Sequence, residues 1–285
     1  MKILAYLLTT SFLLLISGII VFFYGLWYFG KQLPDYKELS KYNPNVVTRI
    51  HAGNGALLAE YAIEKRVFVP INVIPKSVIN AFISAEDKEF YNHFGLDIKA
   101  TLRALLTNVK NIGSGKRLIG ASTITQQVAK NFLLTSEVSF ERKIKEAILA
   151  IRIERAFSKN QILELYLNQV YWGHNAYGIE SASQMYFGKK SKDLTVAESA
   201  GLVGMLKGPE LFSPFKYFQR FKKRQRVVLK RMQYLGIITA EEVEDAYNEE
   251  IALNKRKKHR YKAGYFSSYV VDQLIDMYGE EALYT

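Results

Sequence analysis

The sequence predicts a mostly α-helical protein with one N-terminal transmembrane helix and a short β element. Three observations lead to this prediction. Residues 3–30 contain no charged side chain. Residues that favour helix starts recur along residues 97–242, each before a segment of helical periodicity. Runs of β-favouring residues are confined to residues 46–70, around the turn signal Gly53-Asn54-Gly55.

Composition narrows the function before any motif is considered. The chain has 285 residues, of which 49% are hydrophobic and 23% charged, so disordered and low-complexity proteins are excluded. The absence of cysteine excludes disulfide scaffolds, Cys-ligated zinc, iron–sulfur clusters, thiol nucleophiles and a lipid-modified N-terminal cysteine. The net charge of +12 indicates an anionic partner: a nucleic acid, a membrane surface or a phosphorylated substrate.

The uncharged N-terminal segment is predicted to be an uncleaved membrane anchor over residues 1–31. As a helix, residues 3–30 would be about 42 Å long at ~1.5 Å per residue, and a bilayer core needs about 20 residues. A cleaved signal peptide has an apolar region of only about 7–15 residues. Lysines flank both ends, so the positive-inside rule leaves the orientation open. Three residues fit an interfacial aromatic belt: Tyr24, Trp27 and Tyr28.

Residues 32–70 are predicted as a polar linker followed by the β element. The helical pattern begins at Pro75, and Asp97 is expected to cap a helix that runs through Asn108. Ser139 is expected to open a helix that reaches about Phe157. At four places a capping residue is followed three positions later by Glu or Gln: Thr123 with Gln126, Ser158 with Gln161, Thr195 with Glu198, and Thr239 with Glu242.

Two stretches account for the positive charge, residues 214–235 and residues 254–262, and neither contains an acidic residue. One interpretation is a solvated helix face and a basic loop. The other is contact with anionic lipid headgroups beside the anchor. Nucleic-acid binding is not predicted, because no recognised binding motif accompanies the charge.

Acidic residues crowd together in the first motif, residues 86–97, where a predicted helix ends. Glu86, Asp87 and Glu89 lie within four positions, which suits a general base or acid. The alternative is a solvated acidic helix end. His93 is interpreted as structural.

The second motif, residues 120–131, is a glycine-led loop that enters a helix rich in hydroxyls and amides. Free N–H groups at such a helix start attract anions. Lys130 follows Thr123 by seven residues, so the two can share one face. An ordinary capped helix is the alternative.

In the third motif Arg142 and Glu146 lie four positions apart and share a helix face. A surface ion pair there would contribute under about 1 kcal/mol. Leu149 and Ile153 continue the same stripe, so Glu146 is expected to face a cleft and not bulk water. The fourth and fifth motifs, residues 162–189 and 197–214, are mostly apolar packing with glycines. Lys189 and Lys207 stand out as cations beside those glycines.

Together and in this order, the five motifs resemble the peptidoglycan glycosyltransferases of glycosyltransferase family 51. This domain is found in monofunctional enzymes and in class A penicillin-binding proteins. The resemblance covers about residues 50–235. It departs at Ala121, where the family usually has glycine, and at Phe212, where it often has tyrosine. It implies a lysozyme-like helical domain over residues 71–250 with a small membrane-proximal subdomain.

The resemblance also implies an activity. Such enzymes polymerise lipid II into β-1,4 glycan strands with inversion and release polyprenyl pyrophosphate. It implies that Glu86 is the base and Glu146 a second essential carboxylate, which orients groups or stabilises charge. The substrate-binding residues it implies are Ser122, Thr123, Gln126, Gln127, Lys130, Asn131, Arg142, Lys143, Lys189 and Lys207.

The same resemblance bears on the cofactors, the partners and the location of the enzyme. No cofactor and no dedicated metal site are required, and a divalent cation, Mg or Mn, at the pyrophosphate is compatible with the chemistry. The implied partners are lipid II, the growing strand, the membrane and other cell-wall synthesis proteins. The implied location is the plasma membrane, with a cytoplasmic N-terminus and an extracytoplasmic catalytic domain.

A transpeptidase signature is expected to be absent. Ser213-Pro214-Phe215-Lys216 formally matches Ser-x-x-Lys, but it lies inside the fifth motif and the partner motifs are missing. Lys262-Ala263-Gly264 does not match the third transpeptidase motif, Lys-Thr/Ser-Gly. Residues 251–285 are expected to be a basic loop and the start of a connector. The chain is therefore expected to be part of a bifunctional class A protein and not a natural monofunctional enzyme.

Two other functions compete with this assignment. A lysozyme-like lytic hydrolase would use Glu86 as a general acid, but it would have no need for four cations: Lys130, Arg142, Lys143 and Lys207. A membrane-tethered scaffold would use the basic segments to bind lipid or a partner protein.

Overall fold

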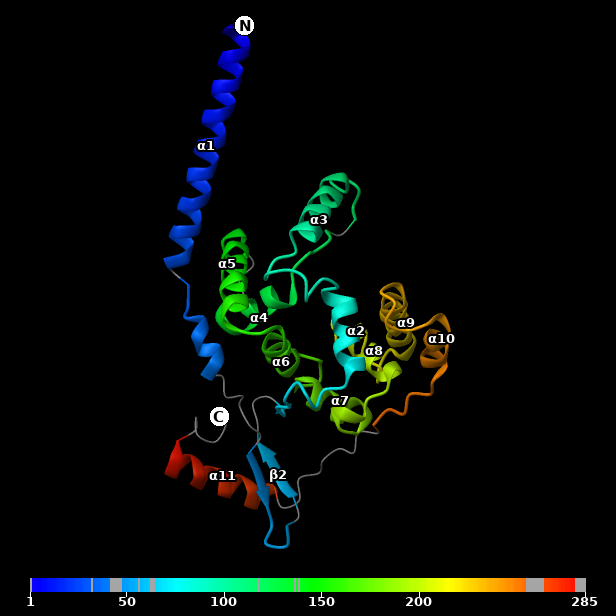
Figure 1. Ribbon diagram of the computed structural model, residues 1–285. Coiled ribbons are helices and arrows are strands. Elements are labelled where there is room, and N and C mark those ends of the chain that lie inside the picture. The colour runs from blue at the N-terminus through cyan, green and yellow to red at the C-terminus, as the bar shows by residue number, and fades with distance from the viewer. Residues whose placement is uncertain are drawn as a thin grey trace. The chain divides into compact units, whose positions relative to one another are not determined.

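The computed structural model describes residues 2–31, 33–41, 48–55, 57–61, 65–116, 118–135, 137, 139–254 and 264–279. Helices dominate these residues, which confirms the predicted fold class (Figure 1). The chain divides into two compact units, each built from two separate stretches of sequence. The first comprises Met1–Lys41 and Asn92–Ser158, and the second comprises Tyr42–Tyr91 and Lys159–Thr285.

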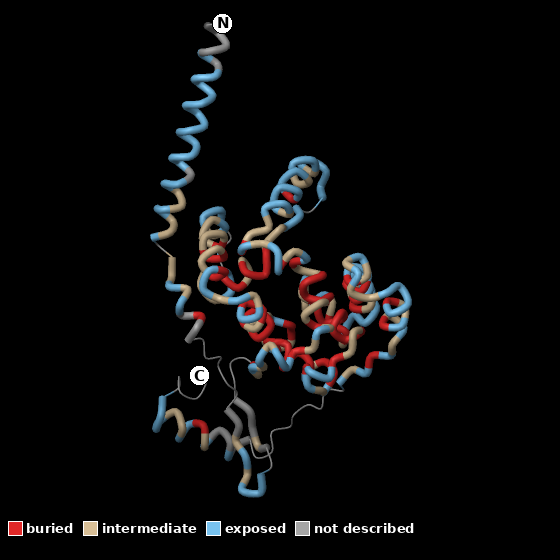
Figure 2. The backbone as a smooth tube through the Cα atoms, in the orientation of Figure 1, coloured by how far each residue is buried: buried red, intermediate tan, exposed pale blue. Residues whose placement is uncertain are grey.

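The first unit begins with α1 (Lys2–Lys31) and the short 3-10 helix η1 (Tyr36–Lys41). Within α1, the segment Leu8–Lys31 has a mean hydropathy of 2.2 and none of it is buried, so α1 is long and apolar enough to cross a membrane. Figure 2 shows the described residues of α1 mostly exposed, while buried residues gather in several of the later helices.

Three more helices complete this unit: α3 (Ile98–Lys110), α4 (Ile124–Leu133) and α5 (Phe140–Ala156). Helices α4 and α5 pack together, and both α1 and η1 contact α5. The apolar core between α4 and α5 is fully buried: Ile124, Val128, Leu149, Ala150 and Ile153. Because α5 packs against both α4 and α1, it is the central helix of the first unit.

The second unit contains two small sheets. Strands β1 (Thr48–His51) and β2 (Leu57–Tyr61) are antiparallel, and the turn between them closes with Gly55 donating to the Ala52 carbonyl at 2.8 Å. This confirms the predicted hairpin. Strand β3 (Lys65–Arg66) pairs in parallel with β4 (Ala176–Tyr177). The segment after β3 is fixed to α6 (Lys159–Gln169) by Asn168, whose side chain both donates to and accepts from the Val69 backbone.

The second unit contains the buried helix α8 (Val196–Met205), in which every residue from Ala197 onward is buried. It packs against α2 (Lys76–Glu86), α9 (Phe218–Tyr234) and α10 (Ala240–Asn248). Gly201 permits this packing, since an added Cβ would lie 2.3 Å from Cζ of Phe221. The remaining elements are α6 (Lys159–Gln169), α7 (Ile179–Phe187), η2 (Ser191–Asp193) and α11 (Gly264–Tyr278).

Most of the predicted helix starts are confirmed. Asp97 accepts a hydrogen bond from the Ala100 N–H, and Ser139 accepts one from the Arg142 N–H at 3.0 Å. Thr123, Thr195 and Thr239 each form a complete capping box. Most of the basic segment predicted at 254–262, and two residues of the incomplete motif at 262–264, lie outside the described residues.

Candidate functional site

In the first unit, two of the predicted site residues, Arg142 and Lys143, contact Glu146 of α5, whose side chain is 1% exposed. Nε of Arg142 lies 3.2 Å from one carboxylate oxygen, and Nζ of Lys143 lies 2.5 Å from the other. These pairs form because residues three and four apart on a helix are neighbours. The burial confirms that Glu146 faces away from bulk water.

Lys143 also joins this cluster to the second motif. Its Nζ donates to Oγ of Ser122 at 3.3 Å, across the loop that precedes α4. The side chain of Lys143 is 48% exposed, whereas that of Arg142 is 11% exposed. A carboxylate whose two oxygens each hold a cation is suited to fixing those cations in place. The cluster therefore presents a fixed ammonium group to an anion from solvent.

The start of α4 is tied to the first motif by Thr123, which is buried. Its hydroxyl accepts from the Gln126 N–H and donates to the Gly95 carbonyl at 2.7 Å. Gly95 has φ of +87°, and an added Cβ would lie 2.7 Å from the Ala150 carbonyl oxygen. Glycine is thus required where this loop crosses α5.

The other predicted site residues on α4 differ in how far they are exposed. Gln127 is half-buried, while Lys130 and Asn131 are exposed and accessible to a ligand. Thr125, which was not predicted as a site residue, is buried and donates to Oε1 of Glu154 at 2.6 Å. This hydrogen bond fixes α4 on α5, so the two motif-bearing helices form one rigid pair.

In the second unit, Glu86 is the last residue of α2 and is half-buried. Burial, followed by the charge of Glu86, raises the pKa of the Tyr166 hydroxyl well above its usual value. Burial and the neighbouring Arg231 lower the pKa of Arg224, while the charge of Glu86 raises it. Glu86 is therefore an electrostatic neighbour of both Tyr166 and Arg224.

The guanidinium groups of α9 are features that sequence reasoning missed. Nη1 of Arg231 donates to the Ala85 carbonyl at 2.5 Å, next to Glu86, and Nε of Arg224 donates to the Gly204 carbonyl at 3.2 Å. From the sequence, residues 214–235 are interpreted as a solvated helix face or as a lipid contact. The sequence signal for these contacts is spacing. Arg224 and Arg231 each follow a buried apolar residue, Phe221 or Val228, by three positions, so each arginine lies on the packed face of the helix.

The two remaining lysines differ in their surroundings. Nζ of Lys189 lies 2.6 Å from the buried carboxylate of Glu198, which also accepts the Thr195 N–H, so Lys189 is held in an internal ion pair. Lys207 is exposed just beyond α8. The geometry leaves Lys207 the more accessible cation of the two.

Acidic side chains do not assemble a metal cage in the described part of the chain. Those residues contain no group of three or more His, Asp or Glu side chains that could hold a metal ion. Both oxygens of Glu146 are already paired with cations. We therefore derive no chemical step through a metal.

Comparison with known proteins adds a second line of argument. The model of the transglycosylase family matches residues 54–233. The chain is 47% identical to penicillin-binding protein 1A of Rickettsia bellii over 94% of this chain and 34% of the relative. It is 43% identical to penicillin-binding protein 1A of Aquifex aeolicus over 94% of this chain and 36% of the relative. The chain thus spans about a third of the length of these relatives.

A solved structure has a similar fold. It is the crystal structure of penicillin-binding protein 1A from Haemophilus influenzae, which matches with a TM-score of 0.52 and 24% identity. The match covers 86% of this chain and 26% of that chain. At this identity the likeness supports the fold alone.

Proposed function

Since this chain belongs to the transglycosylase family, we propose that it is a membrane-anchored peptidoglycan glycosyltransferase. It polymerises lipid II into β-1,4 glycan strands with inversion and releases polyprenyl pyrophosphate. The observation that carries this proposal is the buried Glu146 with two cations fixed on it, beside the hydroxyl of Ser122. Such a cluster suits a diphosphate leaving group.

The proposed chemistry assigns a role to residues of each unit. Glu86 takes the proton from the acceptor 4-hydroxyl, and the acceptor oxygen forms a bond to the donor anomeric carbon. The bond between that carbon and the pyrophosphate oxygen breaks, and the pyrophosphate leaves with the electron pair. Four cations are assigned to the donor phosphates and sugars: Lys130, Arg142, Lys143 and Lys207. A divalent cation at the pyrophosphate, Mg or Mn, stays a prediction.

Glu146 is proposed as a positioning residue and not as a proton acceptor. Its two oxygens hold Arg142 and Lys143, so the carboxylate sets where these cations meet the substrate. Arg224 and Arg231 are proposed to support Glu86 in the same manner, from α9. Hydrogen-bonding support for the substrate is assigned to Ser122, Thr123, Gln126, Gln127 and Asn131, and Lys189 is a weaker candidate because of its ion pair with Glu198.

Helix α1 is proposed to anchor the enzyme in the plasma membrane, since the lipid tail of the substrate stays in the bilayer. The polymer is assembled outside that membrane. We therefore propose a cytoplasmic N-terminus, an extracytoplasmic catalytic domain, and partners among the cell-wall synthesis proteins.

The decisive experiment is incubation of the purified full chain with labelled lipid II, followed by gel separation of the products. We expect a ladder of glycan strands, and no ladder under any lipid or metal condition would overturn the proposal. Incubation with finished peptidoglycan tests the lytic hydrolase, which would release fragments. A tethered scaffold would be indicated if Glu86→Gln left the function in cells intact.

A further inference from the structure

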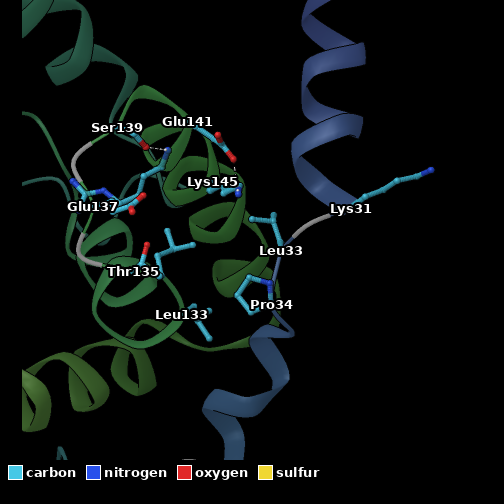
Figure 3. A pocket seen from close by; sticks show the side chains of 11 residues that line it. Lys31, Leu33, Pro34, Leu133, Thr135, Glu137, Ser139, Glu141 and Lys145 are labelled. Atoms are coloured by element: carbon cyan, nitrogen blue, oxygen red, sulfur yellow. Dashed lines mark hydrogen bonds and ion pairs between the residues drawn. The ribbon is translucent and has the colours of Figure 1, made fainter.

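The first unit contains a pocket of about 530 Å³ where the chain leaves α1 (Figure 3). One side is formed by the segment after α1, and the other by the end of α4 and the first turns of α5. Among the residues that line it are Leu33, Pro34, Leu133, Glu141, Arg142 and Lys145.

The position of this pocket is set by the end of α1. Nη2 of Arg152 on α5 donates to the Gly30 carbonyl at 3.3 Å, so α5 caps the last turn of α1. The side chain of Lys31 turns away from the pocket, as Figure 3 shows, and its Nζ lies 3.8 Å from the centre of the Trp27 ring. If α1 spans a membrane as proposed, Trp27 and Lys31 mark the interface, and the pocket opens at headgroup depth.

The wall formed by α5 carries adjacent opposite charges. Nζ of Lys145 lies 2.7 Å from Oε1 of Glu141, and the side chains are 20% and 52% exposed. A simple anion in this pocket would meet the carboxylates of Glu141 and Glu137. A simple cation would meet Lys145 and Arg142. A ligand that carries both charges satisfies both sets of groups.

The facing wall is apolar. In Figure 3, Leu33 and Pro34 approach from the segment after α1, opposite Lys145, and Leu133 lies below them. The pocket is therefore amphipathic, with charge on one side and hydrocarbon on the other. This arrangement fits a molecule that sits at the boundary of a bilayer.

We propose that this pocket binds the phosphoethanolamine headgroup of a membrane phospholipid. Lys145 donates to the phosphate and Glu141 accepts from the primary ammonium, while the apolar wall covers the glycerol backbone. A choline headgroup fits less well, because a quaternary ammonium cannot donate a hydrogen bond to Glu141. The proposal rests on the proposed membrane insertion of α1 but not on the catalytic assignment.

The pocket lies next to the cluster around Glu146. Arg142 lines the pocket, and its guanidinium is also the group that holds Glu146. A ligand that binds the folded state stabilises it by mass action. Phospholipid in the pocket is thus expected to stabilise the first turns of α5, where the cations of the cluster lie.

The test uses the full chain in nanodiscs of phosphatidylcholine, phosphatidylglycerol or phosphatidylethanolamine. Native mass spectrometry after release into detergent measures retained lipid, and thermal unfolding measures stabilisation. We expect selective retention of phosphatidylethanolamine and a higher melting temperature with it. Lys145→Ala and Glu141→Gln should each weaken retention about tenfold, in line with the loss of one charge-assisted hydrogen bond.

Arg155→Ala is the matched control, because Arg155 is exposed on the same helix and does not line the pocket. It should leave retention unchanged. Equal retention of the three lipids, retention of phosphatidylglycerol alone, or no effect of either pocket variant would overturn the proposal. Should Lys145→Ala fail to fold, the exposed Glu141→Gln still decides the question. Lipid retention is measured without lipid II, so failure of the catalytic proposal is seen separately.

Discussion

Glu86 and Glu146 occupy different environments, and the difference matches the different roles proposed for them. Glu86 is half-buried at the end of a helix, next to the arginines of α9. Glu146 is buried and paired with two cations. A proton acceptor must be reachable by substrate, while a positioning carboxylate must hold its partners. The first description fits Glu86 and the second fits Glu146.

Replacement of the proposed base should slow chemistry more than it weakens binding. Glu86→Gln keeps shape and hydrogen bonding but cannot take the acceptor proton. The polymerisation rate should fall by about 10²–10⁴-fold, while the affinity for a lipid II analogue stays near that of the wild type. Polymerisation assays and binding assays on the same preparation check this. A folded Glu86→Gln enzyme with wild-type turnover would contradict the assignment.

Replacement of the positioning carboxylate should cost stability as well as activity. Glu146→Gln removes the buried negative charge that pairs with the largely buried Arg142, which should lower the free energy of unfolding by about 3 kcal/mol. The lost pair with Lys143 adds little to this loss of stability, because the Lys143 side chain is half exposed. Denaturant unfolding measures the loss. Glu244→Gln is the control, since its ion pair with Arg226 is exposed and should contribute under about 1 kcal/mol. Equal effects of the two variants would contradict the buried role.

At the scale of elements, α5 is the helix on which the first unit is organised. It contacts α4, α1 and η1, and the loop at Gly95 crosses it at close range. The cations of the cluster lie on this helix, so its position fixes theirs. Two predictions concern the contacts that hold it.

Gly95→Ala should destabilise the protein strongly. The added Cβ would meet the Ala150 backbone and would also force a left-handed conformation, so we expect a loss of about 3 kcal/mol or more. Gly113→Ala is the matched control, because Gly113 has φ of +80° with open space around it. That variant should lose only about 1 kcal/mol. Denaturant unfolding compares the two, and equal losses would show that the crossing over α5 is not tight.

Arg152→Ala should loosen the last turn of α1. The variant removes the donor to the Gly30 carbonyl, so amide hydrogen exchange around residues 27–31 should speed up about tenfold, as expected for one hydrogen bond from a charged group. Arg155→Ala on the same helix should leave exchange unchanged. Mass-spectrometric exchange in nanodiscs provides the measurement, and unchanged rates in Arg152→Ala would mean that the contact does not hold α1.

At the scale of the whole molecule, each compact unit combines stretches from distant parts of the sequence. The first motif is divided between them, because the second unit includes Tyr91 and the first resumes at Asn92. The proposed topology places residues after α1 outside the cell and the N-terminus of α1 in the cytoplasm.

The lack of cysteine makes this topology directly testable by single-cysteine labelling. Tyr234 is 83% exposed, so Tyr234→Cys should react with a membrane-impermeant maleimide in intact cells stripped of wall and outer membrane. Lys2→Cys should react only after lysis. The reverse pattern would place the catalytic residues in the cytoplasm and would contradict the proposed location.

Local sequence determined the elements of this protein that depend on short-range physics. The capping boxes at Thr123, Thr195 and Thr239 were predictable, because a cap joins residues only three positions apart. The apolar run of α1 is visible in the sequence itself, because residues 3–30 contain no charged side chain. The burial of Glu146 followed from the helical stripe that it shares with Leu149.

Only the tertiary structure decided which charged groups meet. Lys143 reaches Ser122, Lys189 is held by Glu198, and Arg231 contacts the backbone beside Glu86. The partners in these contacts lie from nine to 146 positions apart in the chain. Periodicity assigns a residue to a face of its own helix, but it does not specify which other helix covers that face. The packing of α4 on α5, and of α9 on α2 and α8, supplied that information.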